Sequence, residues 1–564
     1  MGVLRLGAIG TVTTAMLAGT LGGVLAGAPA VAVSTDQSYW IPADKLVTVT
    51  GHGYGHGHGM SQHGAQGAAL QGLTYKEIAD FYYPGTGWKK MKGKVRVLIS
   101  ADTTDDVVVS PAPGLSVRDL RAKTVHELPV RDHVSRWRLH VRDGRTVVQL
   151  YSDRWRPYKA AWAKQIAGDA EFFAKGRLTL WTPSGQRTYR GILRAASPSN
   201  GSSARDTVNV VSMDQYVMGV VPYEMPVSWH PEAVKAQSVA ARTYATWSRS
   251  QNLRRHYQIC DTTACQVYNG TRGEDPRSNA AVRATSREIL THGGRPAFTQ
   301  FSASSGGWTA AGSAPYLVAQ PDPYDGWSGN SVHTWSTAVN VATLERRYPT
   351  IGTLRRIRVT SRDGNGDWQG RVNTLVLDGT AGTRTITGDD FRWALGLRSR
   401  WFTIEPTPII ARWARIGGVR SPVGDVRARE YPVASGVAQR FERGRIFYSR
   451  QTGARELYGR VLTAYRKHGG PRSNLGFPRT AVQKRGVHRL ARFQNGSVYF
   501  KRPDAPVVVT GAIDKRFLAE GGLKSGLGWP KTSTYGVPGG QRVDYEHGFI
   551  TWNRRTGVTK VTHG

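Results

Sequence analysis

The C-terminal third of the chain repeats itself every 52 residues, and this period constrains the fold more than any other feature. The period separates three pairs, Gly417-Gly418, Gly469-Gly470 and Gly521-Gly522, and it recurs in two series of single glycines: Gly424, Gly476 and Gly528, and Gly444, Gly496 and Gly548. A β-forming run follows each member of the last series. Repeats of this length usually form one supersecondary unit each and stack on their neighbours. We expect three β-rich repeats, over residues 409–460, 461–512 and 513–564.

A short proline-rich segment, residues 405–408, separates these repeats from the rest of the chain. Upstream, β-forming runs such as Val95–Ile99 are bounded by Gly, Asp and Asn. The clearest helix begins at Pro231, because proline suits the first helical position and Glu232 complements the helix N-terminus. We expect an α+β fold: a mainly β domain over residues 33–405 with a few helices around a cleft, then a β-rich repeat domain over residues 409–564.

Residues 1–32 have the pattern of an export signal. Arg5 precedes an apolar stretch, and small residues ending at Ala30 and Ala32 fit the cleavage pattern of signal peptides. The alternative is an uncleaved membrane anchor, although no later segment is apolar enough to span a bilayer. We expect a secreted mature protein.

The chain is strongly basic, with 76 Lys and Arg against 40 Asp and Glu and a formal charge of +36. Such an excess attracts polyanions. Export favours anionic envelope polymers over nucleic acid, so we expect no nucleic-acid partner. The alternative is a solvated basic surface without a specific ligand.

Two cysteines, Cys260 and Cys265, follow His256 in an H-x3-C-x4-C pattern. Secretion favours a disulfide between them. The alternative is a structural zinc held by His256, Cys260 and Cys265, but zinc takes about four ligands and this segment supplies three. We expect no other cofactor.

Glu224 is the strongest candidate for chemistry. It lies between two prolines with Tyr223 and Met225 beside it, surroundings that raise a carboxyl pKa. The alternative is a carboxylate at a helix start that only offsets the helix dipole.

Several motifs carry a family resemblance. Val220–Pro226 followed by Ala233–Tyr244 resembles the signature of the SpoIID/LytB family, which comprises stage II sporulation protein D and amidase enhancers; three further segments are similar to that family, namely residues 53–65, 265–270 and 301–307. Leu475–Pro478 resembles the LGFP repeat of wall-associated proteins. In the family the motif that corresponds to residues 53–65 follows the motif that contains Glu224. In this chain the order is reversed, and residues 53–65 come first. The resemblance therefore implies a circularly permuted domain, with the strand Leu46–Thr50 beside Trp401–Ile404.

The resemblance also implies a function. Family members of known activity are lytic transglycosylases that cleave peptidoglycan strands denuded of stem peptides, and Glu224 would serve as acid and base. The alternative is a non-catalytic, wall-binding amidase enhancer. The implied partners are glycan strands, an anionic or arabinogalactan-type wall polymer on the repeats, and a cell-wall amidase. Substrate-binding candidates, each of which could instead be structural, are His56, Gln62, Lys235, Gln237, Arg242, Ser304 and Ser305.

The segment from His52 to His63 is rich in both histidine and glycine. We interpret its glycines as backbone that lies against a bulky substrate, and its histidines as a weaker match to a metal site.

Overall fold

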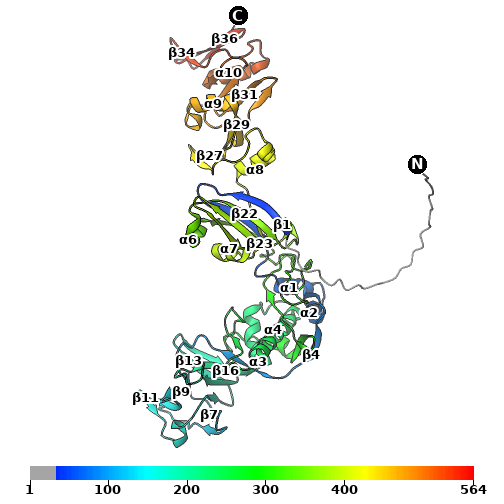
Figure 1. Ribbon diagram of the computed structural model, residues 1–564, viewed down its shortest axis with the longest axis vertical. Coiled ribbons are helices and arrows are strands. Elements are labelled where there is room, and N and C mark those ends of the chain that lie inside the picture. Colours follow the sequence, from blue (N-terminus) through cyan, green and yellow to red (C-terminus); the bar gives the residue numbers. More distant parts are fainter. Residues whose placement is uncertain (1–32) are drawn as a thin grey trace, which may run out of the picture.

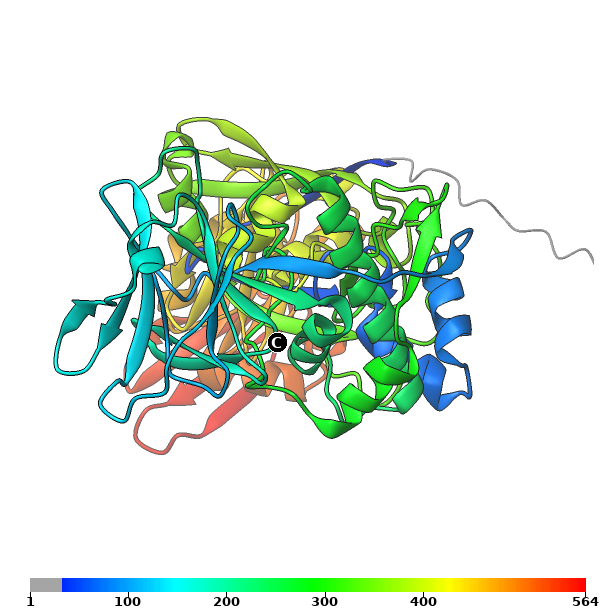
Figure 2. The same cartoon turned by 90° about the horizontal axis from the view of Figure 1, so that it is seen from below.

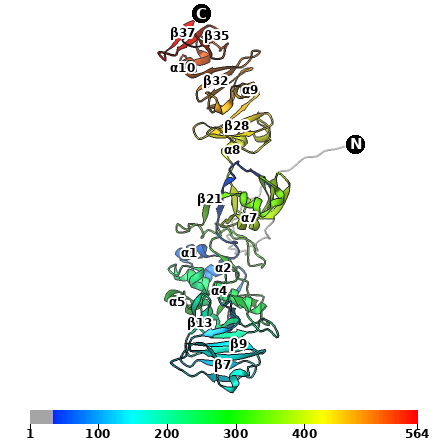
Figure 3. The same cartoon turned by 90° about the vertical axis from the view of Figure 1, so that its left-hand side faces the viewer.

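The computed structural model describes residues 33–564, so the expected export signal lies outside the described residues. Within this range the molecule is elongated, with the repeats at one end and a strand-rich region at the other (Figures 1 and 3). No helix among residues 33–564 is long and apolar enough to cross a membrane.

One large hydrophobic core, between Met60 and Leu317, organises what we call the cleft lobe. Its two main sheets lie beside a group of helices (Figure 2). The seven-stranded sheet has the order β17 (Ile259–Cys260), β5 (Lys94–Leu98), β16 (Asp206–Ser212), β15 (Ile192–Ala196), β12 (Ala170–Phe173), β7 (Ser116–Asp119) and β8 (Val125–Glu127). The six-stranded sheet has the order β11 (Trp155–Pro157), β10 (Arg145–Tyr151), β9 (Arg136–Arg142), β6 (Val107–Val109), β13 (Leu178–Thr182) and β14 (Gly185–Tyr189).

The central helix of this lobe is α4 (Pro231–Gln251), which confirms the helix expected from Pro231. Small residues at helical spacing, including Ala233, Ala236 and Ala240, are buried on it. They allow close packing of its neighbours, which are α1 (Gln62–Leu70), α2 (Tyr75–Tyr82), α3 (Met213–Glu224) and α5 (Pro276–Ala284). The helix α3 was not expected from the sequence.

A second hydrophobic core lies within residues 33–405, and we call this part the bridging lobe. It combines the N-terminal strands β1 (Val33–Trp40) and β2 (Leu46–His52) with later strands: β21 (Thr334–Asn340), β22 (Leu354–Arg362), β23 (Val372–Gly379), β24 (Thr383–Thr387) and β25 (Phe402–Ile404). Strand β2 pairs with β25 through Val49–Ile404 and Thr50–Thr403. This pairing confirms the expected position of Leu46–Thr50 beside Trp401–Ile404, while the permutation relative to the family stays a prediction.

The repeat array consists of three similar units. Each begins with a helix, namely α8 (Pro408–Arg415), α9 (Gly459–Lys467) or α10 (Gly511–Ala519). Each continues into a four-stranded antiparallel sheet, formed by β26–β29 (431–458), β30–β33 (483–510) or β34–β37 (535–563). One core joins side chains of the first and second repeats, such as Phe447 and Phe477. The observed fold is α+β with a β-rich C-terminal region, as expected.

Candidate functional site

Glu224 is the last residue of α3, a helix that Ser212 caps by accepting a hydrogen bond from the Gln215 N–H. The interpretation of Glu224 as a helix-start carboxylate is therefore wrong. At a helix C-terminus the dipole disfavours a negative charge. The carboxyl group is thus not placed to stabilise its own helix.

Burial raises the pKa of Glu224 to about 7, although a hydrogen bond from the Val267 N–H, 3.3 Å from Oε1, opposes the rise. The direction agrees with the sequence-based expectation. Of the two side chains expected beside it, Met225 is buried whereas Tyr223 is exposed. At neutral pH this carboxyl group is present in both protonation states, as a group that acts as acid and then as base requires.

Glu224 lines a cavity of about 290 Å³. Besides Glu224, the cavity is lined by His56 of the glycine-rich segment, Tyr244 of α4, residues 263–267, Gln300 and Phe301. His56 and Glu224, which are far apart in the sequence, thus meet at one cavity.

The His56 imidazole is neutral at physiological pH. Burial, together with the charges of His58, Arg392 and Arg371, lowers its pKa to about 3. Its Nδ1 accepts a hydrogen bond from the His58 N–H at 2.9 Å. A neutral ring whose Nδ1 accepts carries its proton on Nε2. His56 can therefore donate a hydrogen bond but does not supply a positive charge.

The glycines beside His56 lie against protein and not against an open surface, which corrects our interpretation of this segment. Gly53, Gly55, Gly57 and Gly59 all have positive φ. A Cβ on Gly59 would lie 2.1 Å from the Gln300 carbonyl oxygen, and one on Gly55 would lie 2.6 Å from Ser302 Cβ. Glycine is required here because the segment crosses residues 300–305 at close range.

Four of the other substrate-binding candidates lie on or beside α4 and do not line the cavity. Gln62 and Gln237 are buried, and the Gln62 amide donates to Gln237 Oε1 at 3.4 Å. Lys235 pairs with Glu232 of its own helix at 2.6 Å. Arg242 has a fully buried side chain that donates to Asp214 Oδ1 at 2.7 Å, so it ties α4 to α3 and its assignment to substrate is wrong.

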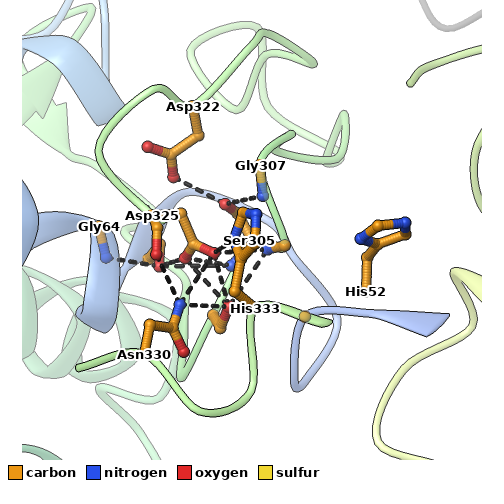
Figure 4. A network of polar contacts seen from close by, with 12 residues as sticks. His52, Gly64, Ser305, Gly307, Asp322, Asp325, Asn330 and His333 are labelled. Atoms are coloured by element: carbon orange, nitrogen blue, oxygen red, sulfur yellow. Dashed lines mark hydrogen bonds and ion pairs between the residues drawn. The ribbon is translucent and has the colours of Figure 1, made fainter. Parts of the chain in front are cut away.

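Ser304 and Ser305 are buried in a polar network centred on Asp325 (Figure 4). The Ser304 hydroxyl donates to Asp325 at 2.8 Å and the Ser305 hydroxyl to Asp322 at 2.7 Å. Both hydroxyl groups are thus engaged within the protein, and their assignment to substrate is wrong as well.

Several lining residues were not predicted from the sequence, among them Thr263, Gln266 and Gln300. The motifs at residues 265–270 and 301–307 pointed to this region without giving any residue a role. Tyr244, the last residue of the motif Ala233–Tyr244, was given no role either, yet it lines the cavity.

The two cysteines form a disulfide beside the cavity. The sulfurs of Cys260 and Cys265 are bonded, 2.10 Å apart, and Cys265 lines the cavity. His256 instead contacts Asp206, with 2.7 Å between Nε2 and Oδ2. The structure therefore does not assemble the alternative zinc ligands, and no cluster of three His, Cys, Asp or Glu side chains in residues 33–564 is arranged to hold a metal ion.

Comparison with known proteins identifies two kinds of module. Residues 202–292, which include Glu224 and the loop at 263–267, match the SpoIID family, described as stage II sporulation protein. Residues 421–473 and 475–525 match the LGFP repeat. This chain thus carries a SpoIID domain and LGFP repeats.

Curated relatives match parts of the chain. An amidase enhancer of Bacillus subtilis is 40% identical over 119 residues, which make up 20% of this chain and 16% of the relative. Stage II sporulation protein D of Bacillus amyloliquefaciens is 29% identical over 38% of this chain and 64% of its own length. An uncharacterised protein of Brachyspira hyodysenteriae is 32% identical over 35% of this chain and 55% of its own length. The chain therefore spans less than two thirds of each, and these relatives support a function related to the cell wall.

Proposed function

We propose that this protein is a secreted lytic transglycosylase that cleaves peptidoglycan strands denuded of stem peptides. The observation that carries this proposal is a lone carboxyl group with a pKa of about 7 at the wall of a cavity. No second carboxylate is among the residues that line the cavity. Glycosidases that use water or an enzyme nucleophile generally need two carboxyl groups. A lytic transglycosylase needs one, because the nucleophile belongs to the substrate.

In this mechanism protonated Glu224 donates its proton to the glycosidic oxygen as the bond to the muramoyl C1 breaks. The resulting carboxylate then takes the proton of the muramoyl C6 hydroxyl, whose oxygen bonds to C1. The products are a strand with a free hydroxyl and a strand with a 1,6-anhydro end, and Glu224 is protonated again. Two other lining residues, His56 and Gln300, carry N–H groups that would donate hydrogen bonds to sugar oxygens.

The repeat array would hold the enzyme on an anionic or arabinogalactan-type wall polymer. The alternative function is that of a non-catalytic amidase enhancer with a cell-wall amidase as partner. It is favoured by the 40% identity to a protein of that name, over a segment that covers 16% of that relative.

Digestion of purified sacculi tests the proposal. The full-length protein should release fragments with 1,6-anhydro-muramoyl ends, detected by mass spectrometry, and prior amidase treatment should increase their yield. Glu224→Gln should release none above background. If the folded wild-type protein releases none but stimulates an added amidase, the enhancer function replaces this one.

A further inference from the structure

The junction between the second and third repeats contains a cavity of about 460 Å³. Side chains of both repeats line it: Arg485, His488, Arg492 and Tyr499 from the second, and Lys524 and Trp529 from the third. The 52-residue period allows a direct comparison with the junction between the first and second repeats.

At the first junction an aromatic side chain lies buried at the position that corresponds to Trp529. Phe477, the counterpart of Trp529, is 2% exposed and lies against Gly436, where an added Cβ would be 2.8 Å from its Cζ atom. At the second junction His488 takes the position of Gly436. Its ring centroid lies 5.0 Å from that of Trp529, and its Nδ1 is held by the Arg502 N–H at 3.0 Å. Trp529 therefore packs against the His488 ring, where Phe477 packs against Gly436, and the cavity lies beside these two rings.

The walls of this cavity combine an aromatic face with positive charge. Trp529 is only partly buried, and its ring can stack on the apolar face of a sugar. Arg485, Arg492 and Lys524 are exposed, and none of them forms an ion pair within the described part of the chain. No carboxylate is among the lining residues. Guanidinium groups bind carboxylates and phosphates through paired hydrogen bonds.

We infer that this cavity binds an acidic sugar unit, one that bears a carboxylate or a phosphate, within an anionic glycan of the wall. The inference rests on the proposed wall-binding role of the repeats, which it narrows to one junction and one ligand chemistry. At the first junction Phe477 is buried against Gly436, so no aromatic face equivalent to that of Trp529 is offered there.

Calorimetric titration of the full-length protein tests the inference with three saccharides: tetragalacturonate for the carboxylate, glucose 1-phosphate for the phosphate, and neutral maltotetraose. At least one acidic probe should bind, and the neutral probe should not. Binding of the carboxylate probe or of the phosphate probe alone supports the site and identifies its anion. Failure of both acidic probes to bind would overturn the inference.

The repeats supply a matched pair of variants. Arg492→Ala removes a charge from the cavity, whereas Arg440→Ala removes the equivalent exposed arginine of the first repeat. Arg492→Ala should weaken binding about tenfold, the loss expected for one charge-assisted contact, and Arg440→Ala less than twofold. Equal losses would instead show a diffuse attraction to the basic surface and overturn the inference. Circular dichroism establishes that both variants are folded.

The saccharide titration tests the binding site at the repeats independently of the proposed enzymatic function. Soluble saccharide binding needs neither sacculi nor cleavage, and Glu224→Gln should leave it unchanged. A protein that binds the acidic saccharide but neither binds nor cleaves sacculi would retain the site and lose the proposed function.

Discussion

Glu224 is a partly buried carboxyl group and Asp325 a fully buried one, and their surroundings also differ in the number of hydrogen-bond donors. Glu224 accepts one long bond, from the Val267 N–H. Asp325 accepts bonds from the hydroxyl groups of Ser61 and Ser304, the backbone of Ser305 and Gly306, Asn330 and His333 (Figure 4).

The pKa values follow this difference. Burial acts on Asp325 as well, but the hydrogen bonds from His333, Ser61 and Ser304 outweigh it and hold the pKa of Asp325 below its ordinary value. The comparison teaches that burial alone does not make a carboxyl group reactive. A buried carboxyl group becomes available for proton transfer when the fold withholds donors from it.

The largest effect on activity is expected when Glu224 is replaced by a side chain that cannot exchange a proton. Glu224→Gln keeps the shape of the side chain, so the protein should fold normally and bind glycan. Turnover should fall by about a hundred- to ten-thousand-fold, the usual contribution of a general acid and base. The measurement is the rate of anhydro-end formation on denuded strands. Near wild-type turnover would show that another residue carries the chemistry.

Replacement of Asp325 should instead strongly lower the free energy of unfolding. Asp325→Ala leaves the partner donors buried and unpaired, and breaking such a buried ionic network typically destabilises a protein by about 3–5 kcal/mol. Urea unfolding followed by circular dichroism measures this change. If the unfolding free energy changed by less than about 1 kcal/mol, the network would not be structural and the contrast would fail.

The two groups should also respond to pH with opposite signs. For Glu224 the folded-state pKa, about 7, exceeds the ordinary 4.5, so stability is lost as the pH rises from 4.5 through 7. For Asp325 the folded-state pKa is lowered, so its contribution is present above the ordinary value of 3.8 and is lost as the pH falls through the folded-state value.

Replacement of Glu224 should remove its part of this pH dependence. At about 1.4 kcal/mol per pKa unit, Glu224→Gln should be more stable than the wild type at pH 8 by about 3 kcal/mol, and equally stable near pH 4. Urea unfolding of both proteins from pH 4 to 8 provides the test. Parallel stability curves would mean that Glu224 titrates at its ordinary pKa.

The smallest effects concern the neighbours of the two groups. His56→Gln should raise KM by about three- to tenfold through loss of one hydrogen bond to substrate, and should lower the unfolding free energy by less than about 1 kcal/mol because the new side chain retains an acceptor for the His58 N–H. Ser305→Ala should leave KM unchanged and lower the unfolding free energy by about 1–2 kcal/mol. Steady-state kinetics and urea unfolding on both variants give the two values. An exchange of these two phenotypes would reverse the roles assigned to the cavity and the network.

Much of the architecture could be predicted from local pattern. The 52-residue period gave the repeat units, Pro231 gave the start of α4, and the motif order gave the pairing of β2 with β25. The second core within residues 33–405 was not foreseen as a separate core, because no motif indicated that β1 pairs with β22. No local pattern reports such a long-range pairing.

The site was predictable only in part, for a related reason. Glu224 and His56 were identified from motifs, and both line the cavity. The same motifs nominated Arg242, Ser304 and Ser305, which the fold buries against Asp214, Asp325 and Asp322. A polar residue in a motif can serve the substrate or the fold, and only its tertiary partners distinguish the two.

The most direct test of the central claim is a titration of the carboxyl carbons by nuclear magnetic resonance. The full-length protein would be labelled with ¹³C at the side-chain carboxyl groups of Glu and Asp, and the spectra of Glu224→Gln and Asp325→Asn would assign the two signals. The account predicts that Glu224 titrates near pH 7 and that Asp325 titrates below its ordinary value of 3.8. A Glu224 signal that titrates near its ordinary 4.5 would contradict the claim that this carboxyl group exchanges a proton at neutral pH.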